Sequence, residues 1–112
     1  MARLGDEAAK GTRVSTTTVN LCELYRGAYA ARARETELGK VEALRDTLDV
    51  LALDTEASRR YGELVNIPGV QEAPIGDFDL LIASIALTHG ERVATRDVEH
   101  FQRVPGLAVE YW

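Results

Sequence analysis

The sequence has little cysteine, no long apolar run and no surplus of basic charge. Its one cysteine, Cys22, lies in an apolar segment, so we expect a small buried hydrophobic residue in a reducing, cytoplasmic setting. No apolar stretch approaches the roughly 20 residues that a membrane-spanning helix needs. The first 13 residues contain no apolar signal-peptide core. We therefore expect no membrane partner.

The charge balance limits the kinds of nucleic-acid partner. The chain has 18 acidic and 13 basic residues, a net charge of −5, which argues against a broad basic surface. A nucleic acid would need a small arginine cluster, or a divalent metal held by carboxylates and bridging them to phosphate. The sequence also lacks a glycine-rich phosphate loop, a cysteine pair and a serine nucleophile motif.

The length of 112 residues predicts a single domain, residues 1–112. Apolar residues at three- and four-residue steps, as in Leu38, Val41 and Leu44, indicate amphipathic helices between short apolar strands. Such alternation predicts an α/β fold with a mostly parallel central sheet and helices on both faces. We expect strands at 13–17, 50–54, 92–95 and 107–112, helices at 18–33, 35–49, 55–66 and 76–89, and a helical turn at 97–104.

The segment PIGDFDLLIAS, residues 74–84, places two aspartates at the start of an apolar helix. Steps of three, four and seven from Asp79 reach only apolar residues, so its side chain is expected to face inward. Steps of four, seven and eleven from Asp77 reach Leu81, Ser84 and Thr88, the polar stripe of this helix, which predicts a solvated position. Asp79 either serves a buried site or only complements the helix dipole.

Asp97 and Glu23 each have both a plain and a functional interpretation, and Thr95 shares the two interpretations of Asp97. Asp97 follows the strand that ends at Thr95, and it either caps the next turn or belongs to a site at the end of the sheet. Glu23 either pairs with Arg26, three residues on, or uses the space beside Gly27 as part of a metal pocket.

The two histidines, His89 and His100, lack a third group at recognisable metal-ligand spacing. We therefore expect neither to be a metal ligand or a proton shuttle.

Three segments together carry a family resemblance: VSTTTVNLCELYRGA, PIGDFDLLIASIAL and VATRDVEHFQRVPGLAVEYW. In this order and spacing, from about residue 13 onward, they resemble PIN-domain proteins of the VapC toxin type. The resemblance implies a PIN-like three-layer sandwich. It also implies an endoribonuclease of a toxin–antitoxin pair, cutting RNA with Mg²⁺ or Mn²⁺ held by a cluster of carboxylates. Family members usually form homodimers and are silenced by a small antitoxin.

The resemblance also implies roles for particular residues. Glu23, Asp79 and Asp97 match the acidic metal-binding and catalytic positions, and Thr95 matches the hydroxyl residue that accompanies the last of them. Hard cations such as Mg²⁺ prefer carboxylate and water oxygens, which agrees with this residue set. Candidate contacts to RNA phosphates are Arg26, Arg92 and Arg96.

One part of the family pattern has no match in the sequence. The family begins with an apolar strand that ends in Asp-Thr or Asp-Ser and lies in the middle of the sheet. We expect no strand upstream of residue 13, and hence a domain that is N-terminally truncated relative to the family, with unpaired neighbours at its centre. With three carboxylates instead of four, we expect weak metal binding and low or absent nuclease activity. The alternative function is a catalytically inactive, PIN-like remnant that binds an antitoxin or another partner.

Overall fold

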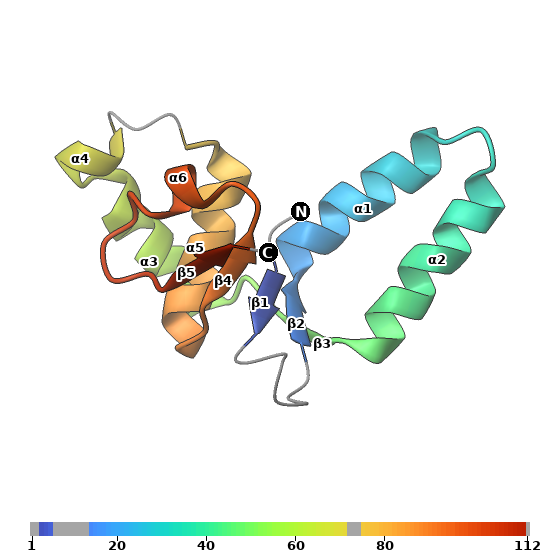
Figure 1. Ribbon diagram of the computed structural model, residues 1–112, viewed down its shortest axis with the longest axis horizontal. Helices are drawn as coiled ribbons and strands as arrows, with labels where there is room; N and C mark the ends of the chain where they lie inside the picture. Colours follow the sequence, from blue (N-terminus) through green and yellow to red (C-terminus); the bar gives the residue numbers. More distant parts are fainter. Residues whose placement is uncertain (1–2, 6–13, 72–74, 112) are drawn as a thin grey trace.

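The computed structural model describes residues 3–5, 14–71 and 75–111, which form a five-stranded sheet with six helices in these ranges. The strand order is β3-β2-β1-β4-β5 (Figure 1). The strands are β1 (Arg3–Gly5), β2 (Val14–Thr17), β3 (Asp49–Leu51), β4 (Val93–Thr95) and β5 (Val109–Tyr111).

Four of the strands run in the same direction, and β1 alone runs against them. β2 pairs with β3 in parallel, β4 pairs with β5 in parallel, and β1 pairs antiparallel with both β2 and β4. The mostly parallel sheet is therefore confirmed. The expectation of no strand upstream of residue 13 was wrong, because Arg3–Gly5 extends between β2 and β4 and pairs with both of them. Asp6 lies outside the described residues.

The helices follow the expected order with small shifts at their ends. They are α1 (Thr18–Ala30), α2 (Arg34–Thr47), α3 (Thr55–Val65), α4 (Pro68–Gln71), α5 (Asp77–His89) and α6 (Val98–Phe101). The short α4 lies between the helices expected at 55–66 and 76–89, where no helix was expected. The strand expected at 50–54 is paired at Asp49–Leu51. Asp54, the last residue of the expected strand, belongs instead to the start of α3, where its side chain accepts a hydrogen bond from the backbone N–H of Ala57.

Helix α5 is the centre of the hydrophobic core. Its residues Ile82, Ala83 and Ile85 are buried, and the core continues through Val93 of β4 and Phe101 of α6. Ser84 is also buried, and its hydroxyl donates to the carbonyl of Leu80, which satisfies it within the helix. The helix ends at His89, as expected, and Gly90 after it adopts the left-handed conformation (φ 67°) that ends many helices.

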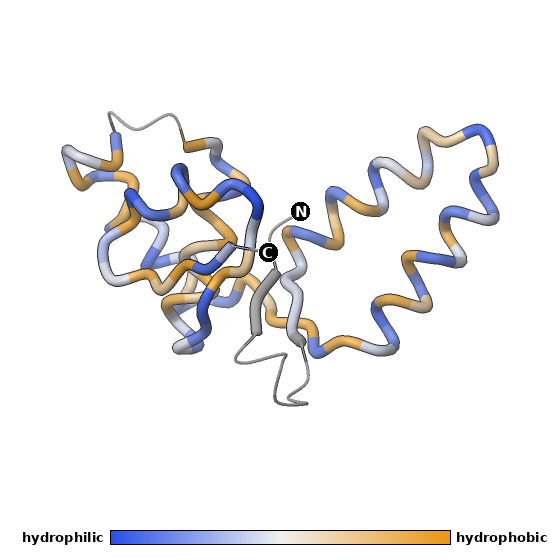
Figure 2. The backbone as a smooth tube through the Cα atoms, viewed as in Figure 1, coloured by the Kyte–Doolittle hydropathy of each residue, from blue (hydrophilic) through white to orange (hydrophobic). Residues whose placement is uncertain are grey.

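Helices α1 and α2 form a hairpin that projects from the sheet, away from α3, α5 and α6 (Figure 1). Along both helices hydrophilic and hydrophobic residues alternate (Figure 2). The two helices pack against each other, and Ala28 of α1 and Val41 of α2 are buried. The expectation that Cys22 is buried was wrong. It is exposed, because only the start of α1 is covered by the sheet and α5.

No helix in the described part of the chain is long and apolar enough to cross a membrane.

Candidate metal centre at the end of the sheet

The candidate site lies at the edge of the sheet where β2 and β4 end. β2 ends at Thr17 and leads directly into α1, and β4 ends at Thr95. Because β2 and β4 run in the same direction, these two ends lie at the same edge, where ligands of α/β folds usually bind. The start of α1 is rigid here: the Thr17 hydroxyl accepts from the Asn20 N–H (3.0 Å) and donates to the Asn20 side-chain oxygen (2.9 Å).

Asp79 reaches this edge from the first turn of α5. Its side chain is half-buried, whereas Asp77, two residues earlier, is exposed and accepts a long hydrogen bond from the Tyr61 hydroxyl (3.4 Å). The difference confirms the helical phase expected from the sequence, because the positions below Asp79 on its own face, including Ile82 and Ala83, are fully buried.

Asp97 reaches the edge from the turn after β4. The buried Thr95 hydroxyl accepts a hydrogen bond from the Asp97 backbone N–H (2.9 Å), which fixes the turn. Asp97 occupies the N-cap position of α6, but its side chain makes no capping hydrogen bond. Its carboxylate lies instead 2.6 Å from the Nδ1 atom of His100, one helical turn further on. The plain capping interpretation therefore does not describe this side chain.

Asp79, Asp97 and His100 form a compact group of possible metal ligands. One ligand atom from each residue lies within 4.8 Å of the other two. Burial raises the pKa of the Asp79 carboxyl, and the negative charge of Asp97 raises it further, while the imidazole of His100 lowers it. Two carboxylates this close in a partly buried place repel each other, and a cation between them would remove that cost.

Glu23 lies outside this group of three. It is exposed on α1, and the described residues show no ion pair between Glu23 and Arg26, although the two are one turn apart. The plain pairing that the sequence allowed is therefore absent, and the carboxylate is available for another contact.

The three candidate phosphate contacts lie in different places. Arg26 is exposed on α1, one turn beyond Glu23, and Arg96 is exposed between Thr95 and Asp97, next to the acidic group. Arg92 precedes β4 at the end of that strand opposite Thr95, and its guanidinium pairs with Glu110 (3.2 Å). The structure therefore brings Arg96 to the edge of the group but not Arg92.

The sequence analysis missed His100. Its signal was the spacing Asp-x-x-His within one expected helical turn, which puts both side chains on one face. His89, in contrast, lies at the end of α5, with Nε2 4.0 Å from Asp54, the residue that caps α3.

The comparisons with known proteins agree with this architecture. The PIN domain profile matches residues 2–107. The chain belongs to the PIN-domain family. Among curated relatives, the tRNA(fMet)-specific endonuclease VapC of Salmonella typhimurium is 33% identical over 101 residues, which are 90% of this chain and 76% of that protein. Ribonuclease VapC1 of Haemophilus influenzae strain R2866 is 30% identical over 100 residues, 89% of this chain and 75% of the relative.

Solved structures of VapBC complexes share the fold. VapBC2 from Rickettsia felis, bound to a DNA fragment from its promoter, superposes with a TM-score of 0.84 at 28% identity, covering 93% of this chain and 78% of that one. DNA-bound VapBC from Salmonella typhimurium gives a TM-score of 0.82 at 33% identity, covering 88% and 74%. The resemblance to PIN-domain proteins of the VapC type and the expected PIN-like α/β sandwich are thus confirmed.

Proposed function

We propose that this PIN-domain protein is a metal-dependent endoribonuclease and the toxin of a VapBC-type toxin–antitoxin pair. The proposal rests mainly on the proximity of Asp79, Asp97 and His100, whose possible ligand atoms lie within 4.8 Å of one another at one edge of the sheet. The names of the relatives, which are ribonucleases and endonucleases, support the substrate class.

The residues of this group fit a divalent cation. Two carboxylates within 4.8 Å of each other supply the oxygen ligands that Mg²⁺ and Mn²⁺ prefer, and an imidazole nitrogen is also acceptable to Mn²⁺. Burial, and after it the negative charge of Asp97, raises the pKa of Asp79, so a cation between the two carboxylates would favour their charged forms. We assign Asp79 and Asp97 as ligands, and we propose Glu23 as a further ligand that reaches the site from α1.

Each side chain then has a distinct task. A bound Mg²⁺ or Mn²⁺ lowers the pKa of a water and offsets charge on the scissile phosphate. We propose Asp79 as the carboxylate that would accept a proton from the attacking water. His100 holds the Asp97 carboxylate in place at 2.6 Å, and Thr95 fixes the turn that carries it. Arg96 and Arg26 are the proposed contacts to RNA phosphates.

We further propose that the protein forms a homodimer and is inhibited by a small antitoxin. The support for the antitoxin is that the structural neighbours were solved as VapBC complexes, and the homodimer is carried over from the family resemblance. Co-expression with a small protein encoded beside it should give a complex that elutes as one species and no longer cleaves RNA. Sedimentation of the chain alone tests the homodimer.

A second candidate function is a catalytically inactive module that binds the antitoxin. The observation in its favour is that the described residues bring only two carboxylates into the group, with Glu23 outside it. In this form the fold would persist while metal binding stayed weak.

Cleavage of RNA in the presence of Mn²⁺ separates the two functions. The nuclease function predicts that the wild-type chain cleaves a labelled RNA with added Mn²⁺, in contrast to the low or absent activity expected from the sequence, and that the Asp79→Asn variant loses this activity. Asp77→Asn is the matched control, because Asp77 lies in the same helical turn but is exposed and outside the group of ligands. If wild type and Asp79→Asn are equally inactive while both bind the antitoxin, the inactive module is correct.

A further inference from the structure

Two arginines on the α1–α2 hairpin have no partner among the described residues. Most other basic side chains form ion pairs with carboxylates, as Lys40 does with Glu37 and Arg59 does with Glu63. Arg26 and Arg32 are exposed, and the described part of the chain gives them neither an ion pair nor a hydrogen bond. In a chain of net charge −5, two guanidinium groups without a carboxylate partner are available to an external anion.

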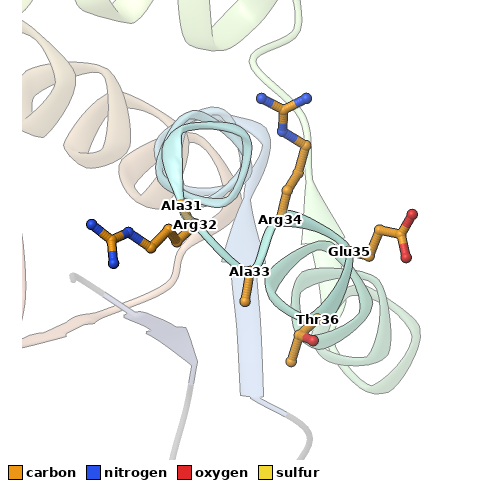
Figure 3. Close-up of a pocket in the computed structure, with 6 residues that line it drawn as sticks. All are labelled: Ala31, Arg32, Ala33, Arg34, Glu35 and Thr36. Carbon is orange, nitrogen blue, oxygen red and sulfur yellow. The ribbon is translucent and has the colours of Figure 1, made fainter.

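Arg32 lies in the turn between the two helices, at the tip of the hairpin. The turn surrounds an open hollow of about 510 Å³ lined by residues 31–36, in which alanines at 31 and 33 leave space beside the charged side chains. Arg34 is held, because its Nε donates to the carbonyl oxygen of Tyr29 (3.0 Å). Figure 3 shows the Arg32 guanidinium on one side of the turn, the Glu35 carboxylate on the opposite side, and Arg34 in a third direction. The positive end of Arg32 is therefore not neutralised by Glu35.

Helix α1 connects this tip with the edge of the sheet that carries the acidic group. The helix begins at Thr18, directly after β2, and then bears Glu23 and Arg26 before it ends at Ala30. At about 1.5 Å per residue, this helix spans roughly 18 Å. At about 3.4 Å per nucleotide, the axial spacing along one strand of a DNA duplex, the same distance corresponds to roughly five nucleotides.

We propose that the α1–α2 hairpin is a second contact for the RNA strand, in which Arg32 binds a backbone phosphate about five nucleotides from the scissile bond. This inference rests on the proposed nuclease function and adds the direction in which the RNA leaves the site. Arg26 lies between the acidic group and the hairpin tip and contacts an intermediate phosphate. The contact is to the backbone, so it favours longer single-stranded substrates without selecting a base sequence.

Binding without cleavage tests the hairpin contact directly. Fluorescence anisotropy with labelled single-stranded RNAs of about 4 and about 16 nucleotides, the range of site sizes of single-strand binding modules, is measured in EDTA. We expect Arg32→Gln to weaken binding of the longer RNA several-fold and to lower its salt slope by about 0.7, the value for one phosphate contact to a single strand. Binding of the shorter RNA should not change. Arg60→Gln is the matched control, because Arg60 is an equally exposed arginine without a described partner on α3.

The outcomes separate this inference from the proposed function. If the wild-type chain binds and cleaves RNA but Arg32→Gln behaves as Arg60→Gln at both lengths, the hairpin contact is refuted and the nuclease function stands. If Arg32→Gln weakens binding of the short and the long RNA equally, Arg32 does not contact a phosphate remote from the scissile bond, and the inference is also wrong. If the wild-type chain neither binds the long RNA nor cleaves it with Mn²⁺, both proposals fall. Thermal unfolding of each variant confirms that the hairpin is still folded.

Discussion

Replacing Asp79 by asparagine should stabilise the protein in the absence of metal. Asp79 and Asp97 have carboxylate oxygens within 4.8 Å of each other, and burial and this neighbouring charge both raise the pKa of Asp79. At an effective dielectric constant of about 20, two unit charges at that distance repel by roughly 3 kcal/mol. Screening by water, together with the attraction between Asp97 and His100, reduces the net cost to about 1 kcal/mol.

The sign of the pH dependence follows from the raised pKa. A carboxyl whose pKa is higher in the folded state stabilises the fold below its unfolded-state pKa of about 3.9, and this contribution is lost as the pH rises through the folded-state value. The Asp79→Asn variant should therefore be more stable than wild type at pH 7. The difference should disappear as the pH falls toward 4.

Thermal unfolding in EDTA measures this effect. An increase of about 1 kcal/mol raises the Tm of a domain of this size by roughly 4 °C. Asp77→Asn, in the same turn, should show no such increase, because Asp77 is exposed. Adding Mn²⁺ should reverse the order, since the wild type gains stability from the bound ion and Asp79→Asn does not. If Asp79→Asn is no more stable than Asp77→Asn at pH 7 in EDTA, Asp79 and Asp97 do not repel each other as described.

Three further predictions concern neighbouring parts of the structure. Thr17→Ala removes both the cap of α1 and the hydroxyl donor to Asn20, and it should lower the free energy of unfolding in urea by about 1 to 2 kcal/mol; a loss below a few tenths would contradict the capping role. Phe101→Ala empties a fully buried position between α6 and the sheet, and we expect a loss of about 3 to 5 kcal/mol in the same assay. His100→Gln releases the Asp97 carboxylate, so Mn²⁺ affinity by calorimetry should fall about tenfold. Glu99→Gln, its exposed neighbour, should leave that affinity unchanged.

Local patterns in the sequence predicted most of the fold. The three- and four-residue steps in α2 and α5, the start of α3 at Thr55 and the end of α5 at His89 are local features, and the structure places them where the sequence indicated. β1 was missed because three residues carry no readable periodicity, and their pairing depends on β2 and β4, which lie about ten and ninety residues along the chain.

The acidic group was predicted only in part, because only some of its features are local in the sequence. The inward phase of Asp79 is a property of one helix, and the position of Asp97 after a strand is a property of one turn. The partner of Asp97 was not expected, because a lone histidine is ambiguous until the turn shows it 2.6 Å from the carboxylate. The position of Glu23 relative to the acidic group depends on how α1 leaves the sheet, which the sequence does not indicate. Its role as a ligand stays a prediction.

A crystal structure of the protein soaked in Mn²⁺ tests the central claim most directly. The account predicts one anomalous peak about 2 Å from carboxylate oxygens of Asp79 and Asp97, with the Glu23 side chain turned toward it. An anomalous map without a peak at these two aspartates, from crystals in which Asp79, Asp97 and His100 keep the arrangement described, would contradict it.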